Sequence, residues 1–140
     1  MCNFSIASFQ DIKLYFKDES QNPTWSFKDR LCSVAVSKAV EIGAKKITIA
    51  STGNHGAAVS LAMKILNVNG KIIVPKNAAH NKVENIKKLG GIVEFYGKDC
   101  IESEFRAQEI ARDTGSTYIS PYNDPMIVSG QGTIGIELDN

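Results

Sequence analysis

The chain has 140 residues, of which 43% are hydrophobic and 22% charged, and this suits one soluble globular domain with its own core. The net charge is +1 with Lys and Arg scattered, and no apolar run approaches the roughly 18 residues of a membrane span. Nucleic-acid binding and membrane insertion are therefore not expected. Cys2, Cys32 and Cys100 are far apart in the sequence, so we expect reduced thiols in a cytoplasmic protein and no metal site.

The first half of the chain alternates strand and helix patterns. Residues 12–16 have the composition of a short strand, and Asn22-Pro23-Thr24 predicts a loop. A helical pattern runs from Asp29 to Gly43, residues 47–50 form an apolar β-branched run typical of a buried strand, and a second helical pattern follows a turn. The apolar residues at helical spacing in these two segments are Leu31, Val34, Ala35, Ala39, Ile42, Ala57, Ala58, Leu61, Ala62 and Ile65.

The alternation continues to the end of the chain. Strands are predicted at 71–74, 92–96 and 117–119, and helices around 83–89 and 99–114, with a last helix of undefined bounds after Pro121. Short connections between alternating strands and helices favour a parallel sheet with helices on both faces, which gives three layers. We therefore predict an α/β fold whose ligands bind beyond the carboxyl ends of the strands.

The segment Ser51-Thr52-Gly53-Asn54-His55 lies where a strand passes into a helix. The free N–H groups of a helix start, together with the helix dipole, favour a bound anion. The same residue types also serve as helix N-caps, and the glycine could serve the turn alone. The segment is thus a candidate anion site, with simple capping as the alternative.

Lys28 is a candidate nucleophile because it lies at a predicted helix start. The positive end of the helix dipole there favours the neutral, reactive amine. The alternative is an ordinary solvated lysine beside Asp29.

The segment from Gly130 to Gly135 fits the dinucleotide pattern G-x-G-x-x-G. It comes near the end of the chain, with no following strand and acidic residue, so a nucleotide role is not expected. We interpret these glycines as points of close backbone approach at a helix start.

Three motifs in order resemble a known family. They are Asn-Pro-Thr-x-Ser-Phe-Lys-Asp-Arg, Ser-Thr-Gly-Asn-His-Gly, and Pro-Tyr-Asn-Asp-Pro followed by Gly-Gln-Gly-Thr-Ile. Their order and spacing resemble the fold-type-II pyridoxal-phosphate enzymes, the tryptophan synthase beta-like superfamily. That family includes threonine and serine dehydratases, serine racemase, threonine synthase and cysteine synthase. The histidine of the second motif and the Gly-Gln-Gly-Thr segment look most like the dehydratase branch.

The resemblance implies site residues and a cofactor, pyridoxal 5'-phosphate. Lys28 would be the Schiff-base lysine and the base for the substrate α-proton, Asn54 would bond the cofactor's phenolic oxygen, and Phe27 would pack beside the cofactor. The loop that binds the substrate carboxylate would consist of Ser51, Thr52, Gly53, Asn54 and His55. Tyr122 would contact the substrate side chain.

The chain departs from the family pattern in two ways. Trp25 stands where relatives have a small glycine. Relatives are about twice as long, so we expect a truncated fold whose phosphate-binding glycine loop lies outside this chain. The expected organisation is 1–42 as the start of a large domain, 43–121 as a small α/β domain, and 122–140 as a return segment to the large domain.

The function implied is a serine or threonine dehydratase-like ammonia-lyase, which eliminates a β-substituent to give a 2-oxo acid and ammonia. One alternative is a threonine-synthase-like β-replacement enzyme acting on a phosphorylated substrate. Another is a non-catalytic fragment that acts through a partner chain. The expected partners are a small amino-acid substrate and either a second copy of the chain, as a homodimer, or a complementary C-terminal fragment.

Overall fold

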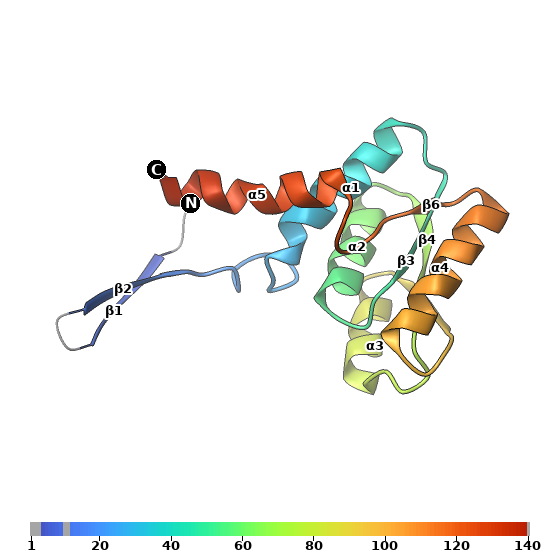
Figure 1. Ribbon diagram of the computed structural model, residues 1–140, viewed down its shortest axis with the longest axis horizontal. Helices are drawn as coiled ribbons and strands as arrows, with labels where there is room; N and C mark the ends of the chain where they lie inside the picture. Colours follow the sequence, from blue (N-terminus) through green and yellow to red (C-terminus); the bar gives the residue numbers. More distant parts are fainter. Residues whose placement is uncertain (1–3, 10–11, 140) are drawn as a thin grey trace.

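The computed structural model describes residues 4–9 and 12–139, and its centre is a parallel sheet (Figure 1). The strands β3 (Lys46–Ala50), β4 (Asn69–Val74), β5 (Ile92–Phe95) and β6 (Thr117–Tyr118) lie in the order β5-β4-β3-β6. Helices α2 (Asn54–Ile65), α3 (His80–Lys88) and α4 (Cys100–Thr114) connect them in turn, and α1 (Lys28–Glu41) precedes β3. The predicted parallel α/β architecture is confirmed.

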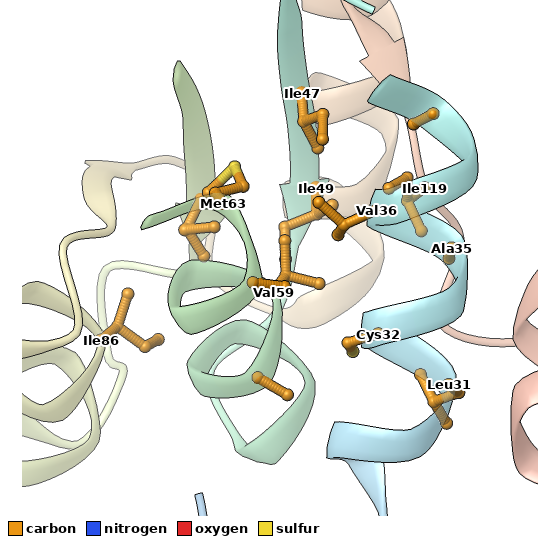
Figure 2. Packing of buried hydrophobic residues seen from close by; sticks show 14 of the residues in the cluster. Leu31, Cys32, Ala35, Val36, Ile47, Ile49, Val59, Met63, Ile86 and Ile119 are labelled. Atoms are coloured by element: carbon orange, nitrogen blue, oxygen red, sulfur yellow. The ribbon is translucent and has the colours of Figure 1, made fainter. Parts of the chain in front are cut away.

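Side chains alternate between the two faces of the sheet, as the two-residue period of a strand requires. Ile49 of β3 and Ile72 of β4 belong to a core shared with α1, α2 and α3 (Figure 2). Ile73 belongs to a second cluster on the other face, with Ala107 and Ile110 of α4. The connection from β5 back to β6 reverses direction across the sheet, and a right-handed crossover then puts α4 on the opposite face.

Two residues expected on inner helix faces are exposed. Ile42 is 70% exposed because α1 ends at Glu41 and the chain turns away through Gly43, whose φ is +94°. Ile65 is 72% exposed although it lies seven residues after the buried Ala58, on nearly the same side of α2, because it is in the last turn of the helix and lines an open cavity.

An antiparallel hairpin lies apart from the parallel sheet (Figure 1). It joins β1 (Phe4–Phe9) to β2 (Ile12–Lys17). The strand predicted at 12–16 is confirmed, whereas β1 was not predicted. Tyr15 and Phe16 are more than half exposed, so β2 contributes little to either core.

Helix α5 (Pro125–Asp139) packs against α1 and extends away from the sheet (Figure 1). A Cβ added at Gly130 would lie 2.6 Å from Leu31 Cα, so glycine permits this close contact. The interpretation of these glycines was therefore right about close approach at Gly130. It was wrong about their place, because Gly130 to Gly135 lie inside the helix rather than at its start. Among the described residues, no helix is long and apolar enough to cross a membrane.

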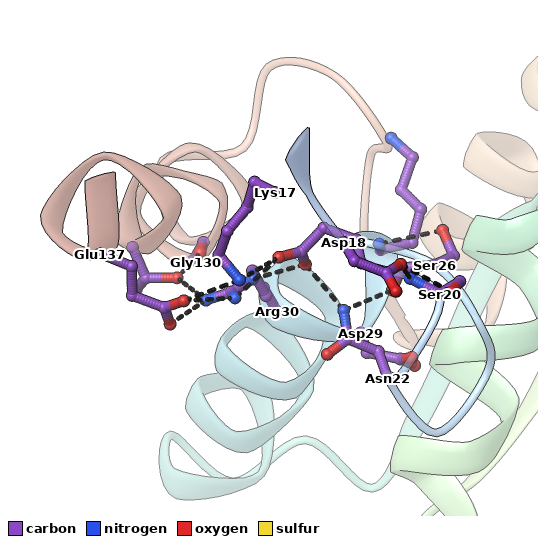
Figure 3. A network of polar contacts seen from close by, with 12 residues as sticks. Lys17, Asp18, Ser20, Asn22, Ser26, Asp29, Arg30, Gly130 and Glu137 are labelled. Carbon is purple, nitrogen blue, oxygen red and sulfur yellow. Dashed lines mark hydrogen bonds and ion pairs between the residues drawn. The ribbon is translucent and has the colours of Figure 1, made fainter. Parts of the chain in front are cut away.

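Ion pairs connect α1, α5 and the chain after β2 (Figure 3). Arg30 Nε lies 2.7 Å from Glu19, and Arg30 Nη1 lies 2.7 Å from Glu137. Lys17 Nζ lies 3.0 Å from each of these carboxylates. Hydrogen bonding from Arg30 is the main reason that the pKa of Glu19 falls to about 2. This network fixes the loop that leads into Lys28.

Candidate functional site

The N-termini of four helices meet at the carboxyl edge of the parallel sheet. Each helix runs antiparallel to its neighbouring strand, so α1, α2, α3 and α4 all begin at this edge. The strand order also changes direction here, because β3 lies between β4 and β6. A point where the strand order reverses is the place where open α/β sheets bind ligands. A pocket of about 370 Å³ lies at this edge.

This pocket collects almost all of the residues proposed from the sequence. Its lining includes Lys28 from the start of α1 and Tyr122 from the segment after β6. The loop between β3 and α2 contributes Ser51, Thr52, Gly53, Asn54 and His55. Phe27 is not part of the lining, although its ring centroid lies 4.9 Å from Lys28 Nζ.

The loop before Lys28 is tied by hydrogen bonds that leave the lysine ammonium available. Asp29 accepts from the backbone N–H of Thr24 at 2.7 Å and from its hydroxyl at 2.8 Å. The carboxylate of Asp29 is thus engaged by Thr24 rather than by Lys28. Within the described chain, Lys28 Nζ makes no ion pair or hydrogen bond, and its ring contact with Phe27 is a cation–π contact. Lys28 is partly exposed, so its surroundings fit a nucleophile as well as an ordinary solvated lysine beside Asp29.

The N-cap residue of α2 is Gly53, and the hydroxyl of Ser51, two residues earlier, binds the first amides of the helix. The Ser51 hydroxyl oxygen accepts from the N–H of Gly53 at 3.2 Å and from the N–H of Gly56 at 3.1 Å. The amides of Asn54 and His55 have no hydrogen-bond partner in the part of the chain that the structure describes. These two amides at the positive end of the α2 dipole can donate hydrogen bonds to an anion.

His55 is buried, with 4% of its surface exposed. Its Nδ1 lies 3.4 Å from Cys32 Sγ, and its Nε2 has no hydrogen-bond partner among the described residues. Burial, followed by the charge of Lys28, lowers the pKa of His55 to about 4. The imidazole is therefore neutral at neutral pH and contributes no charge to the pocket.

Four polar pocket residues were missed by the sequence reasoning: Lys82 of α3 and Cys100, Ser103 and Glu104 of α4. The predicted topology contained the signal that could have found them. Each lies in the first turns of a helix that follows a parallel strand, and such helix starts meet at one edge of the sheet.

A larger cavity of about 570 Å³ lies elsewhere, between the chain after β2, α1, α2 and α5. Its apolar lining comes from α2 and includes Leu61 and Ile65. Its rim carries Lys17, Arg30 and Glu137 of the ion-pair network. None of the residues proposed from the sequence lines it, so the smaller pocket is the better candidate.

Comparison with known proteins gives a consistent result. The model of the pyridoxal-phosphate dependent enzyme family matches residues 5–140. Serine racemase of Arabidopsis thaliana is 41% identical over 96% of this chain and 41% of its own length. The chloroplastic threonine dehydratase 2 of Solanum lycopersicum is 36% identical over 91% of this chain and 22% of its own length. The structure of maize serine racemase is similar with a TM-score of 0.84 and 33% identity, over 96% of this chain and 43% of the maize chain. The chain thus spans less than half the length of these relatives.

Proposed function

The chain belongs to the pyridoxal-phosphate dependent enzyme family, and we propose that it carries part of a serine or threonine ammonia-lyase. One observation supports this most directly: Lys28 lines the same pocket as the Ser51 to His55 loop. A nucleophilic amine and an anion-binding loop are the two groups that an amino-acid substrate and this cofactor require. Threonine dehydratase and serine racemase, which are similar to this chain, bear names that point to hydroxylated amino acids.

The residues present fit the cofactor. The pocket volume is within the range of about 300–1,000 Å³ typical of small-molecule sites. Lys28 would hold the cofactor through its Nζ, which no carboxylate occupies in the described chain. Asn54 would hold the cofactor's phenolic oxygen, and Phe27 would lie beside the ring.

Different residues of the chain would bind the substrate and accept its proton during an elimination. When bound, pyridoxal phosphate supplies a ring that withdraws electron density from the substrate's α-carbon. The open amides of Asn54 and His55 would hold the substrate carboxylate and orient the α-hydrogen. Lys28 Nζ would accept the α-proton, and Tyr122 would lie near the substrate side chain. Loss of the β-hydroxyl and hydrolysis would give a 2-oxo acid and ammonia.

A second candidate is amino-acid racemisation. It is favoured by the 41% identity with a serine racemase over nearly the whole chain. Racemisation needs the same α-proton removal but returns a proton to the opposite face of the substrate. Product analysis with L-serine separates the two: a 2-oxo acid supports the lyase, and D-serine supports the racemase.

We also propose the division into 1–42, 43–121 and 122–140. The parallel sheet lies wholly within the middle segment, and α5 of the last segment packs on α1 of the first. Helix α1 also contributes Leu31 and Val36 to the sheet core, so the first two segments share apolar contacts. Cytoplasmic location and pairing with a second copy or a complementary chain are further proposals, the former supported by the free thiols of Cys32 and Cys100.

The decisive experiment is reductive labelling of the chain with pyridoxal phosphate and borohydride, followed by peptide mapping. Lys28 should carry the label. Lys82 is the matched control, because it lines the same pocket and we propose no contact between it and the cofactor. Lys28→Ala should abolish specific labelling, whereas Lys82→Ala should preserve it. Equal labelling of Lys28, Lys45, Lys71 and Lys87 would contradict the assignment.

A further inference from the structure

The candidate pocket contains a carboxylate that the proposed reaction does not use. Among the described residues that line the pocket, Glu104 of α4 is the acidic one, and it is partly buried. It comes three residues before the fully buried Ala107, so it lies on the side of α4 that faces the sheet. Ala50 at the end of β3 lines the same pocket and packs on the cluster that contains Ala107. Glu104 therefore stands beside the end of β3, where the loop of residues 51–55 begins.

A tyrosine of the neighbouring strand fixes the position of this carboxylate. The Tyr118 hydroxyl donates a hydrogen bond to Glu104 Oε1 at 2.8 Å. Burial, followed by this hydrogen bond, raises the pKa of Tyr118 above its usual value, so the hydroxyl keeps its proton and remains a donor. The Tyr118 side chain also packs on the cluster of Ile73, Ala107 and Ile110, which limits its movement. One oxygen of Glu104 is thus held in place from β6.

The negative charge of Glu104 is not neutralised by a neighbouring side chain. Among the described residues, no lysine or arginine forms an ion pair with Glu104, although Lys28 and Lys82 line the same pocket. Within the same part of the chain, Oε2 of Glu104 accepts no hydrogen bond. A carboxylate that is partly removed from water is stabilised by a cation or by further donors. A ligand in the pocket can supply both with an ammonium group.

We propose that Glu104 recognises an ammonium group on the substrate side chain, so that the pocket prefers diamino acids to amino acids with a hydroxyl or a carboxylate there. The inference rests on the proposed function, which directs the substrate carboxylate to residues 51–55 and its side chain toward Tyr122. Tyr122 follows Tyr118 by four residues and lines the same pocket as Glu104, so the carboxylate lies toward the proposed side-chain position. Glu104 would attract a cationic side chain and repel an acidic one, and both effects contribute to selectivity.

Three amino acids of matched size test this preference by binding alone. The 140-residue chain is titrated at about pH 6 with 2,3-diaminopropionate, serine and aspartate, and the amides of residues 51–56 and of Glu104 are followed by NMR. The three share the α-ammonium and α-carboxylate and differ in the side-chain group. Diaminopropionate should bind roughly tenfold more tightly than serine, the effect of about one charge-assisted hydrogen bond, and aspartate should bind most weakly. Equal affinities would overturn the inference and leave Glu104 as a group that balances the charge of Lys82.

Two charge-matched variants separate a local contact from net charge. Glu104→Gln keeps the size of the side chain and an acceptor for Tyr118, and it should bind diaminopropionate and serine equally. Glu109→Gln makes the same change in net charge on the same helix, outside this pocket, so it should keep the preference of the parent. A methyl spectrum matching the parent shows that each variant is folded. Loss of the preference in both variants, or in neither, would overturn the inference.

Tyr118→Phe tests the positioning role of the tyrosine. The variant loses the donor to Glu104 and keeps the charge, so the preference for diaminopropionate should fall severalfold while aspartate still binds most weakly. An unchanged preference would overturn the role of Tyr118. Reductive labelling keeps the two proposals distinguishable: label at Lys28 with equal affinities overturns this inference alone, whereas absence of label at Lys28 overturns the proposed function.

Discussion

Two regions of the molecule are stabilised by different means. The sheet region, residues 46–119, has a core of aliphatic side chains such as Ile47, Ile49 and Ile72, which are fully buried. The outer region, residues 12–27 and 125–139, exposes large apolar side chains such as Tyr15 and Ile136. Its contacts with α1 are the buried side chain of Ile127, the close approach at Gly130 and the ion-pair network. The difference teaches that apolar side chains in similar sequence patterns become buried only where another helix or strand packs over them.

The largest expected effect comes from removing apolar volume in each region. Ile49→Ala should lower the free energy of unfolding by about 2–5 kcal/mol, because it removes a fully buried side chain. Phe16→Ala removes a larger side chain that is 52% exposed, and it should change stability by less than about 1 kcal/mol. Urea unfolding followed by far-UV circular dichroism measures both. Similar losses in the two variants would show that the outer region has a core of its own.

The sequence predicted the sheet region well for a physical reason. Residues 47–50 form a short β-branched apolar run that is buried on both faces, and only a central parallel strand suits that pattern. The outer region was predicted less well. The pairing of β1 with β2 and the packing of α5 on α1 depend on contacts between distant segments, and no local period encodes them. The exposure of Ile65 had the same cause, since a helical pattern does not show which apolar residues at the end of a helix are covered by other segments.

The second expected effect concerns the contact between α5 and α1. Gly130→Ala would put a Cβ 2.6 Å from Leu31 Cα and 2.8 Å from Arg30 O, so the helices would have to separate. We expect a loss of about 1–3 kcal/mol, typical of overpacking. Gly132→Ala is the matched control, since its Cβ would meet nothing within 4 Å, and alanine should add up to about 1 kcal/mol of helix stability. Thermal unfolding of the two variants should give shifts of opposite sign. A gain in both would show that α5 does not need this close contact.

The sequence anticipated which residues meet in this pocket where residue type and position both carried information, and their roles stay predictions. Lys28 and the Ser51 to His55 loop combined reactive residue types with helix starts, and the structure brings them into one pocket. Cys32 gave no such signal, because a cysteine within an apolar helical pattern is ordinary core. Its contact with His55 depends on the crossing of α1 and α2, which the sequence pattern does not define.

The third expected effect is a dependence on pH that is confined to the outer region. The pKa of Glu19 is about 2 in the folded chain, below its usual value of 4.5, chiefly because Arg30 donates to it. Its stabilising contribution is therefore complete above about pH 4.5 and is lost as the pH falls toward 2. After correction for the slower intrinsic exchange at low pH, the protection factors of amides near Glu19 and in α5 should fall in this window, while those of β3 should stay high.

Glu19→Gln is the control for this pH effect, since it cannot titrate. The variant should show faster exchange near position 19 at neutral pH and a flatter dependence between pH 4.5 and 2. An unchanged pH profile in Glu19→Gln would assign the acid sensitivity to other carboxylates.

The smallest expected effect concerns two left-handed residues, one in each region. Asn67, between α2 and β4, has φ +53° and is of a type that adopts this conformation readily. Trp25, in the loop before Lys28, has φ +57° although a bulky side chain is disfavoured there, and the residue is 73% exposed, so little packing compensates. Trp25→Gly should therefore raise stability by up to about 1 kcal/mol, partly offset by the freedom glycine adds to the unfolded chain. Asn67→Ala should instead lower stability by a similar amount.

Chemical unfolding of both variants checks the contrast, and reductive labelling of Trp25→Gly at Lys28 checks that the loop still presents the lysine. A loss of stability in Trp25→Gly would mean that the indole makes a favourable contact, and the left-handed backbone would then be maintained for that contact.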